Sequence, residues 1–171
     1  MALVGMMGAG KSSLGRRLAA RLGVEFRDAD AEIESAAGCS ISNIFARYGE
    51  SAFRDCERRV IERLLGEAPH VLATGGGAFV DAETRARMKT SAVTVWLNVS
   101  LDVLLARITR KDNRPLLKTG DPREILERLL REREAFYAEA DLVIEGDNGP
   151  HDQAVERIMA LLAERGDWEG A

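Results

Sequence analysis

The feature that most constrains this chain is a glycine-rich turn close to its start. Gly5, Gly10, Lys11 and Ser12 follow a short apolar run in the spacing G-x-x-x-x-G-K-S. From Leu14 onward apolar residues recur at helical spacing, so the turn joins a strand to a helix. Glycines let backbone N–H groups turn inward, and the helix N-terminus adds positive potential, which together cradle phosphate oxygens. The sequence therefore predicts an α/β protein that binds a nucleoside triphosphate.

The side chains of this loop suit separate parts of a bound ATP. Lys11 is expected to neutralise charge on the β- and γ-phosphates, and Ser12 is expected to ligate Mg²⁺. The residues expected to bind the nucleotide are Gly8, Ala9, Gly10, Lys11, Ser12 and Ser13. A chance glycine-rich turn is the alternative, but the strand, the spacing, the Lys-Ser pair and the following helix all agree. The loop predicts ATP binding and says nothing about the phosphoryl acceptor.

Short apolar runs alternate with longer segments of helical spacing along the 171 residues. This alternation is typical of a parallel sheet with crossover helices, and the length suits one domain over residues 1–171. The predicted strands cover residues 2–5, 24–28, 70–74, 93–98 and 141–145. The predicted helices cover a segment with Leu14, Leu18 and Leu22 on one face that stops near Gly23, and residues 50–66, 82–89, 101–108, 123–139 and 151–165. We expect a three-layer α/β/α fold of the P-loop NTPase type with a five-stranded parallel sheet.

Residues 109–122 fit neither the strand nor the helix spacing. The segment is charged and contains Gly120 and two prolines, which is typical of a loop between two helices. We expect this loop to be a mobile lid. Arg114 lies inside it and could stabilise charge on the transferring phosphoryl group, although a solvated loop arginine is the alternative.

The charge balance disfavours two classes of partner. A net charge of −4 and a pI near 5.4 argue against a general binder of nucleic acids or membrane surfaces. Residues 107–133 nevertheless hold nine lysines and arginines against five acids, which fits either a solvated helix face or a region for an anionic ligand. Cys39 and Cys56 form no CxxC pair, so free thiols are expected.

Location and oligomeric state follow from what the sequence lacks. The chain start has no basic segment of the kind that precedes a signal sequence, and no run of 18 apolar residues occurs elsewhere. A cytoplasmic protein is therefore expected, and nothing in the sequence calls for a dimer, so we expect a monomer. The first strand is short, which leaves open whether residues are missing before it or the chain starts there.

Several polar residues stand where apolar ones are expected. Asp28 and Asp30 close the second strand, and a strand continuing there would point both carboxylates to the same side, toward metal and acceptor. A helix N-cap is the alternative for Asp30. Arg133 shares a helix stripe with Leu126, Leu130 and Tyr137, which favours capture of an anion over extension of the side chain into solvent.

Glu57 lies on the apolar face of its predicted helix, and Arg54 is one turn before it. A buried carboxylate needs a partner, and Arg54 could pair with it while presenting donors to a substrate. A surface salt bridge is the alternative, and it is slightly favoured by the sequence alone. After the third strand, Gly75, Gly76 and Gly77 let the backbone approach a ligand closely, with a flexible turn as the competing explanation.

These motifs together resemble the shikimate kinase family over nearly the whole chain. The segments that carry the resemblance are GMMGAGKSS, DAD at 28–30, FRDCE at 53–57, TGGG at 74–77, RPLL at 114–117 and REREAFY at 131–137. The resemblance implies transfer of the ATP γ-phosphoryl group to the 3-hydroxyl of shikimate, giving 3-phosphoshikimate and ADP in chorismate and aromatic amino-acid biosynthesis.

The resemblance also implies a role for each matching residue. Asp30 would receive the acceptor hydroxyl, and Ser12 and Asp28 would support Mg²⁺. Arg54 and Arg133 would hold the shikimate carboxylate, Glu57 would orient Arg54, and the backbone of Gly75, Gly76 and Gly77 would meet the ring hydroxyls. Lys11 and Arg114 would hold the phosphates, and Arg107 would stack on adenine. The family's second adenine contact falls near residues 147–150, where this chain lacks an arginine.

Two other readings compete with this one. A kinase for gluconate or a nucleoside monophosphate would also surround an anionic acceptor with arginines, but the triple glycine together with DAD and FRxxE disfavours it. A non-catalytic ATP-binding relative would be expected to lose Lys11, Asp30 or an acceptor arginine, and this chain retains them all.

Overall fold

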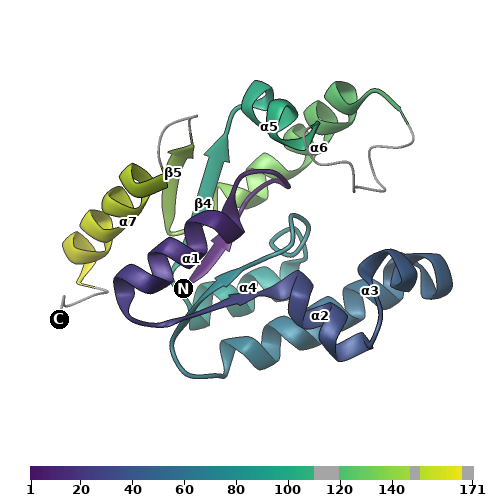
Figure 1. Ribbon diagram of the computed structural model, residues 1–171, viewed down its shortest axis with the longest axis horizontal. Helices are drawn as coiled ribbons and strands as arrows, with labels where there is room; N and C mark the ends of the chain where they lie inside the picture. The colour runs from purple at the N-terminus through teal and green to yellow at the C-terminus, as the bar shows by residue number, and fades with distance from the viewer. Residues whose placement is uncertain (110–119, 147–150, 167–171) are drawn as a thin grey trace.

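The architecture is a parallel sheet covered by helices on both faces (Figure 1). The computed structural model describes residues 1–109, 120–146 and 151–166, and within these residues the sheet has five strands in the order β2-β3-β1-β4-β5. The strands are β1 (Ala2–Val4), β2 (Glu25–Asp28), β3 (His70–Ala73), β4 (Thr94–Val99) and β5 (Leu142–Gly146). The prediction of a five-stranded parallel α/β sheet is confirmed.

The short strand β1 lies at the centre of the sheet. Ala2 pairs with Leu72 of β3 on one side and with Thr94 of β4 on the other, and all three residues of β1 are fully buried. The chain continues to β2 and β3 on one side of β1 and to β4 and β5 on the other. Such a reversal of strand order leaves a crevice at the carboxyl ends of the strands, where ligands of open α/β sheets bind.

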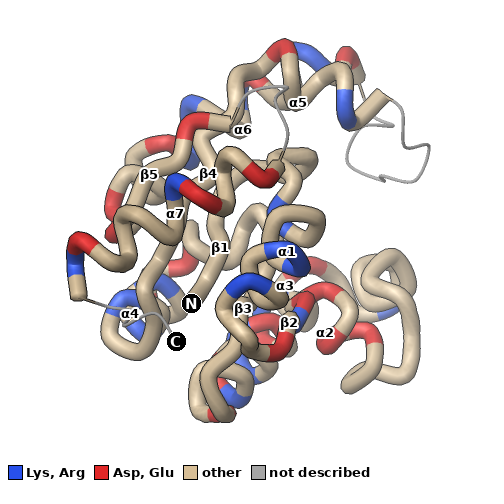
Figure 2. The backbone as a smooth tube through the Cα atoms, turned by 60° about the vertical axis from the view of Figure 1, so that its left-hand side comes forward, with Lys and Arg blue, Asp and Glu red and all other residues tan. Residues whose placement is uncertain are grey.

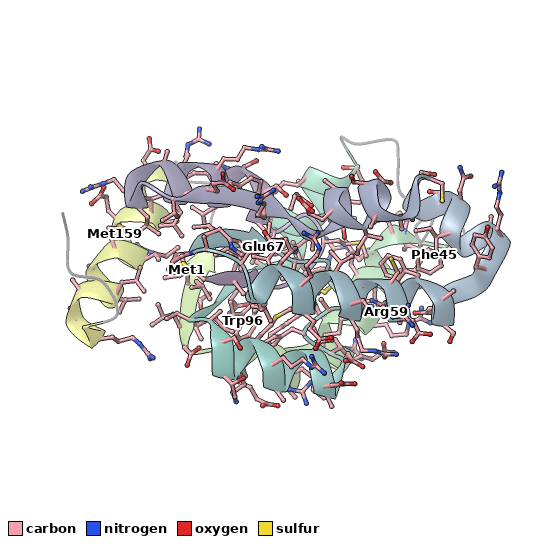
Figure 3. The ribbon with its side chains drawn as sticks, turned by 90° about the horizontal axis from the view of Figure 1, so that it is seen from below. Met1, Phe45, Arg59, Glu67, Trp96 and Met159 are labelled. Atoms are coloured by element: carbon pink, nitrogen blue, oxygen red, sulfur yellow. The ribbon has the colours of Figure 1, made fainter. Side chains whose placement is uncertain are left out.

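Helices pack against both faces of this sheet. Figure 3 shows α1 on one side of the sheet and α4 on the other. The helices are α1 (Lys11–Leu22), α2 (Ala29–Ala37), α3 (Ile41–Leu65), α4 (Ala82–Ser91), α5 (Leu101–Ile108), α6 (Pro122–Tyr137) and α7 (His151–Arg165). The predicted stop of α1 is confirmed, because Gly23 caps it in the left-handed region with φ 69°. None of the helices described is long and apolar enough to cross a membrane.

Two helical segments were not predicted from the sequence. One is α2, and the other is the first part of α3, which precedes Gly49. Gly49 has φ 80° and ψ 176°, so it interrupts the helical backbone and divides α3 into two helices. The apolar spacing after Gly49 was visible in the sequence, whereas α2 buries only Ala29 and Ile33 and so leaves little periodic signal.

The expected continuation of the second strand through Asp30 is wrong. β2 ends at Asp28, which caps α2, and its carboxylate accepts hydrogen bonds from the backbone N–H groups of Asp30 at 3.1 Å and Ala31 at 3.5 Å. The alternative that Asp30 is the N-cap is also wrong, because Asp30 lies in the first turn of the helix. Asp28 acts as the N-cap because its backbone is extended, with φ −116° and ψ 115°, while its side chain accepts from the first turn of α2.

The start of β4 is tied to the start of β5 by a buried threonine. The N–H and hydroxyl of Thr94 donate to Asp141 Oδ2 at 2.8 and 2.6 Å, and the Asp141 N–H bonds to the Thr94 hydroxyl at 2.9 Å. Thr94 is fully buried, so water does not reach the Thr94 side of these bonds.

We expect Thr94→Val to lower the free energy of unfolding by about 1–3 kcal/mol, because the Asp141 N–H would lose its partner. Urea denaturation measures this change. Thr90→Val is the control, since the exposed Thr90 hydroxyl bonds only to carbonyls of its own helix, Ala86 and Arg87; its effect should stay within about 0.5 kcal/mol. Equal losses in both variants would contradict the role given to Thr94.

Candidate active site

The glycine-rich loop lies between β1 and α1 and has the backbone that the motif requires. Gly5, Gly8 and Gly10 have φ of 130°, 82° and 98°, in the region that side chains disfavour. A Cβ on Gly8 would lie 2.8 Å from Ile108 Cγ1, so α5 also leaves no room there. Gly10, the N-cap of α1, offers no side-chain acceptor to the helix N-terminus. The N-terminus of α1 therefore has the form of an anion site.

Lys11 lies beneath this loop. Its Nζ donates to the carbonyl oxygens of Gly5 at 2.7 Å and Met6 at 2.9 Å, and the residue is 8% exposed. A buried ammonium is costly unless oxygens surround it, so these bonds fix the cation at the loop. Its position agrees with the predicted contact to phosphate oxygens.

The two predicted metal ligands are adjacent. Ser12 Oγ, in the first turn of α1, donates to Asp28 Oδ2, at the end of β2, over 2.7 Å. Two side-chain oxygens from neighbouring elements thus meet beside the glycine-rich loop. Figure 2 shows that further acidic residues follow along α2.

A second group of charged side chains surrounds the turn after β3. A Cβ placed on Gly75 would lie 2.9 Å from Glu57 Oε1 and 3.1 Å from Asp30 Oδ1. Asp30, from α2, and Glu57, from α3, therefore reach the same point of the backbone. The predicted acceptor residues from three separate segments are brought together here.

Glu57 is buried, with 3% of its side chain exposed. Its Oε2 accepts a 2.6 Å bond from Arg54 Nη1, and its Oε1 has no hydrogen-bond partner within the part of the chain that the structure describes. Arg54 also pairs with the exposed Glu50 at 3.3 Å. The predicted pair is present, but it is not the surface salt bridge that the sequence slightly favoured, because the second half of α3 packs Glu57 against the turn after β3.

Burial raises the pKa of Glu57, and the negative charges of Asp30 and Asp81 act in the same direction, while Arg54 opposes them. The pKa of this carboxyl group is raised overall because desolvation outweighs the arginine. The site therefore holds one carboxyl group that is costly to ionise next to an exposed one, Asp30.

The three glycines after β3 lie where there is little space for a side chain. None of them has a positive φ, so the backbone conformation alone would accept other residues. A Cβ on Gly77 would lie 2.5 Å from Arg54 Nη1, and a Cβ on Gly76 would lie 3.2 Å from the backbone nitrogen of Met7. The turn is thus closely packed against its own surroundings, and the approach of its backbone to a ligand stays a prediction.

Arg133 turns toward this same turn. Its Nη1 donates to the carbonyl oxygen of Gly76 at 3.2 Å, so the guanidinium does not simply extend into solvent. Leu126 and Tyr137, from the same stripe of α6, are buried as expected. Helix α6 thus places the half-buried guanidinium of Arg133 at the edge of the sheet, beside Gly76.

A small hollow lies on the other side of the glycine-rich loop. Its wall includes Ala9, Arg107 and Ile144, and also His151 and Gln153 from α7. Arg107 Nη1 donates to the carbonyl oxygen of Ala9 at 3.0 Å, which holds the predicted adenine contact against the loop. Arg114, most of the predicted lid at 109–122 and the predicted adenine contact at 147–150 lie outside the described residues.

The family model for shikimate kinase matches residues 7–163 of this chain. The chain belongs to the shikimate kinase family. The shikimate kinase of Paramagnetospirillum magneticum is 58% identical over 160 residues, which cover 94% of this chain and 82% of that protein. Shikimate kinase is a family of kinases that use ATP as the phosphoryl donor, so the predicted nucleotide agrees with the family.

Solved structures agree with this assignment. The shikimate kinase from Acinetobacter baumannii in complex with shikimate has a TM-score of 0.92 and 40% identity, with 96% of this chain and 92% of that chain covered. A gluconokinase from Sinorhizobium meliloti has a TM-score of 0.57 and 19% identity, covering 97% of this chain and 93% of that one, which shows a shared fold alone.

Sequence reasoning missed three residues near these groups. His151 and Gln153 line the hollow beside Arg107, and their only signal was a position at the start of the last predicted helix. Tyr137 was recognised as part of the Arg133 stripe but was given no role in the site. Its hydroxyl donates to the carbonyl oxygen of Gly76, which no spacing rule could indicate.

The raised pKa of Glu57 predicts a pH dependence of stability. Ionising this carboxyl group costs more in the folded than in the unfolded protein, so stability falls as pH rises from the ordinary glutamate pKa through the raised folded pKa. Glu57→Gln removes this dependence. As the pH rises from the ordinary glutamate pKa to the raised pKa of Glu57, the melting temperature of the variant minus that of the wild type should therefore increase.

Glu50→Gln is the matched control, because Glu50 is the exposed second partner of Arg54. Exposed ion pairs contribute little, so its melting curve should follow the wild type at each pH. Parallel curves for Glu57→Gln and the wild type at every pH would contradict the raised pKa.

Proposed function

We propose that this chain transfers the γ-phosphoryl group of ATP to the 3-hydroxyl of shikimate, giving 3-phosphoshikimate and ADP in chorismate and aromatic amino-acid biosynthesis. The observation that carries the proposal is the meeting of two sites at one sheet edge. A Cβ on Gly76 would lie 3.2 Å from Met7 N of the glycine-rich loop and 3.6 Å from Arg133 Nη1. A donor loop and an acceptor arginine are thus separated by a single glycine.

On the donor side, the loop and α1 would bind the ATP phosphates. Backbone N–H groups from Gly8 to Ser13 would surround the phosphate oxygens, and Lys11 would neutralise their charge. Arg107 would stack on the adenine base from the wall of the hollow next to Ala9. These roles rest on the helix N-terminus, the buried Lys11 and the Arg107 bond described above.

The residues present fit Mg²⁺ bound together with ATP. Ser12 and Asp28 meet over 2.7 Å, and no group of three or more His, Cys, Asp or Glu that could hold a metal occurs in the described residues. Mg²⁺ commonly takes one or two protein ligands and fills its remaining positions with phosphate oxygens and water. Ser12 would ligate the ion directly and Asp28 through water. When bound, the ion would offset the negative charge of the β- and γ-phosphates.

On the acceptor side, Arg54 and Arg133 would hold the carboxylate of shikimate. Guanidinium groups suit a carboxylate because they offer paired donors and stay charged. Asp30 would accept the proton of the attacking hydroxyl or orient it. Glu57 Oε1, which has no hydrogen-bond partner among residues 1–109, 120–146 and 151–166, could accept a bond from another ring hydroxyl, while Oε2 keeps Arg54 in place.

Phosphoryl transfer depends on positioning and charge neutralisation more than on covalent chemistry with the protein. Asp30 and Lys11 would supply these two effects, and Arg114 would add a third charge from a lid over residues 109–122. Closing such a lid would exclude water that could otherwise hydrolyse ATP. We further propose that residues 1–171 act as one kinase domain, as a monomer in the cytoplasm.

The competing functions have weaker support. The gluconokinase likeness, at 19% identity, extends to the fold alone, whereas the shikimate kinases reach 58%. A non-catalytic relative has no need of Asp30 beside Glu57 or of Arg133 on Gly76, and both arrangements are present.

The acceptor is tested by measuring ADP release with shikimate, quinate, gluconate and nucleoside monophosphates. We expect shikimate to stimulate ADP release most, and we expect EDTA to stop it by removing Mg²⁺. A control reaction without acceptor measures ATP hydrolysis. Stimulation by gluconate and not by shikimate would overturn the proposal.

Two substitutions separate turnover from acceptor binding. Asp30→Asn should lower kcat by about 10²- to 10⁴-fold with little change in KM, because it removes the proton acceptor. Arg133→Ala should raise the KM for shikimate by at least about 30-fold with a smaller effect on kcat, because a carboxylate would lose its charged partner.

Arg128→Ala is the control for Arg133→Ala, since Arg128 lies on the same helix, is exposed and pairs with Glu132. Its kinetics should match those of the wild type. Unchanged kinetics in both Asp30→Asn and Arg133→Ala would refute the assigned roles while leaving the acceptor assay intact.

A further inference from the structure

Tyr137, the last residue of α6, is fully buried against both halves of the site. Its hydroxyl donates to the carbonyl oxygen of Gly76 and lies 3.8 Å from the sulfur of Met6, which belongs to the glycine-rich loop. Its ring centroid lies 6.0 Å from that of Trp96 in β4. A tyrosine enclosed in this way can donate its proton only to groups fixed by the fold.

The acceptor of this bond, the carbonyl oxygen of Gly76, receives two side-chain hydrogen bonds and lies close to the glycine-rich loop. Gly76 lies against the glycine-rich loop, because a Cβ there would be 3.2 Å from Met7 N and 3.6 Å from Gly5 O. The same carbonyl oxygen accepts a 3.2 Å bond from Arg133 Nη1. A carbonyl oxygen has two lone pairs, and here Tyr137 and Arg133 use one each.

Burial raises the pKa of Tyr137, while the charge of Arg133, a hydrogen bond from Arg133 and the charge of Arg54 act against this. The hydroxyl therefore keeps its proton at neutral pH and stays a donor. Satisfying a buried phenol is needed in any core, so a purely structural role is the simplest alternative. The acceptor indicates a role beyond stability, because the same carbonyl oxygen of Gly76 accepts hydrogen bonds from both Tyr137 and the guanidinium of Arg133.

We propose that Tyr137 is a positioning residue that sets the guanidinium of Arg133 for the acceptor carboxylate by fixing the Gly76 carbonyl between them. This inference rests on the proposed function. With the hydroxyl in place, one N–H of Arg133 is anchored and the remaining donors keep one orientation. Without it, the Gly76 carbonyl is held by Arg133 alone, and the guanidinium and the carbonyl can shift together.

Tyr137→Phe tests this, because it deletes the hydroxyl and keeps the ring. We expect the KM for shikimate and its dissociation constant from calorimetry to rise about 3- to 10-fold, the effect of one lost hydrogen bond. The kcat and the KM for ATP should change less than about 2-fold, because the glycine-rich loop keeps its own contacts. A general structural defect would instead lower kcat and weaken both substrates together.

A double-mutant cycle with Arg133→Ala asks whether Tyr137 acts through the arginine. The quantity to compare is kcat/KM for shikimate, which can be measured even when saturation cannot be reached. In the Arg133→Ala background, Tyr137→Phe should change kcat/KM by less than about 1.5-fold, because the group that it positions is gone. An equal loss in both backgrounds would overturn the proposal.

Tyr48→Phe is the matched control, because it deletes the hydroxyl of the chain's other tyrosine, which is 66% exposed. Thermal unfolding confirms that each variant is folded at the assay temperature, and a Tyr137→Phe chain that cannot fold would show that the hydroxyl serves stability alone, against the proposal. If the wild type neither binds nor phosphorylates shikimate, the proposed function fails and this inference with it. If the wild type does both and Tyr137→Phe behaves like Tyr48→Phe, only this inference fails.

Discussion

The site depends on one steric constraint, the close approach of two glycine turns at the carboxyl edge of the sheet. The glycine-rich loop follows β1 and the triple-glycine turn follows β3, and these strands are hydrogen-bonded neighbours. Thr74 reinforces the approach, since its hydroxyl donates to the carbonyl oxygen of Leu3 over 2.9 Å. Any side chain at Gly76 would push the turns apart. The proposed phosphoryl transfer depends on this approach, because it brings the proposed ATP-binding loop and the proposed acceptor residues together.

Charge is organised around these turns by burial. Lys11 is buried under carbonyl oxygens, and Glu57 is buried against Arg54. Desolvation makes the energy of each of these charges depend strongly on its partners. An anionic ligand that binds beside Lys11 or Arg133 would therefore pair with a cation that the fold already holds in place. Most other ion pairs, such as Arg128 with Glu132, are exposed and contribute little to stability or function.

Much of the fold could be predicted because its signals are local. The strand, turn and helix around Gly10 follow from spacing alone, and the positions of α5, α6 and α7 follow from apolar periodicity. The failures have physical reasons as well. Gly49 breaks the backbone of α3 where the period restarts, and α2 is short and mostly exposed, so its helical state depends on the cap at Asp28 and on packing against α3.

The sequence by itself determined which chemical groups are available, because residue types and short spacings predict a phosphate loop, and the family resemblance adds two arginines proposed to hold the acceptor. Only the tertiary structure decided which of these meet. Asp30, Glu57 and Gly75 come from three elements, and Tyr137 reaches Gly76 across 61 positions of the chain. Such contacts depend on strand order and helix packing, which act between distant segments and leave no local pattern. For the same reason the burial of Glu57, and with it the raised pKa, could not be predicted from its helix alone.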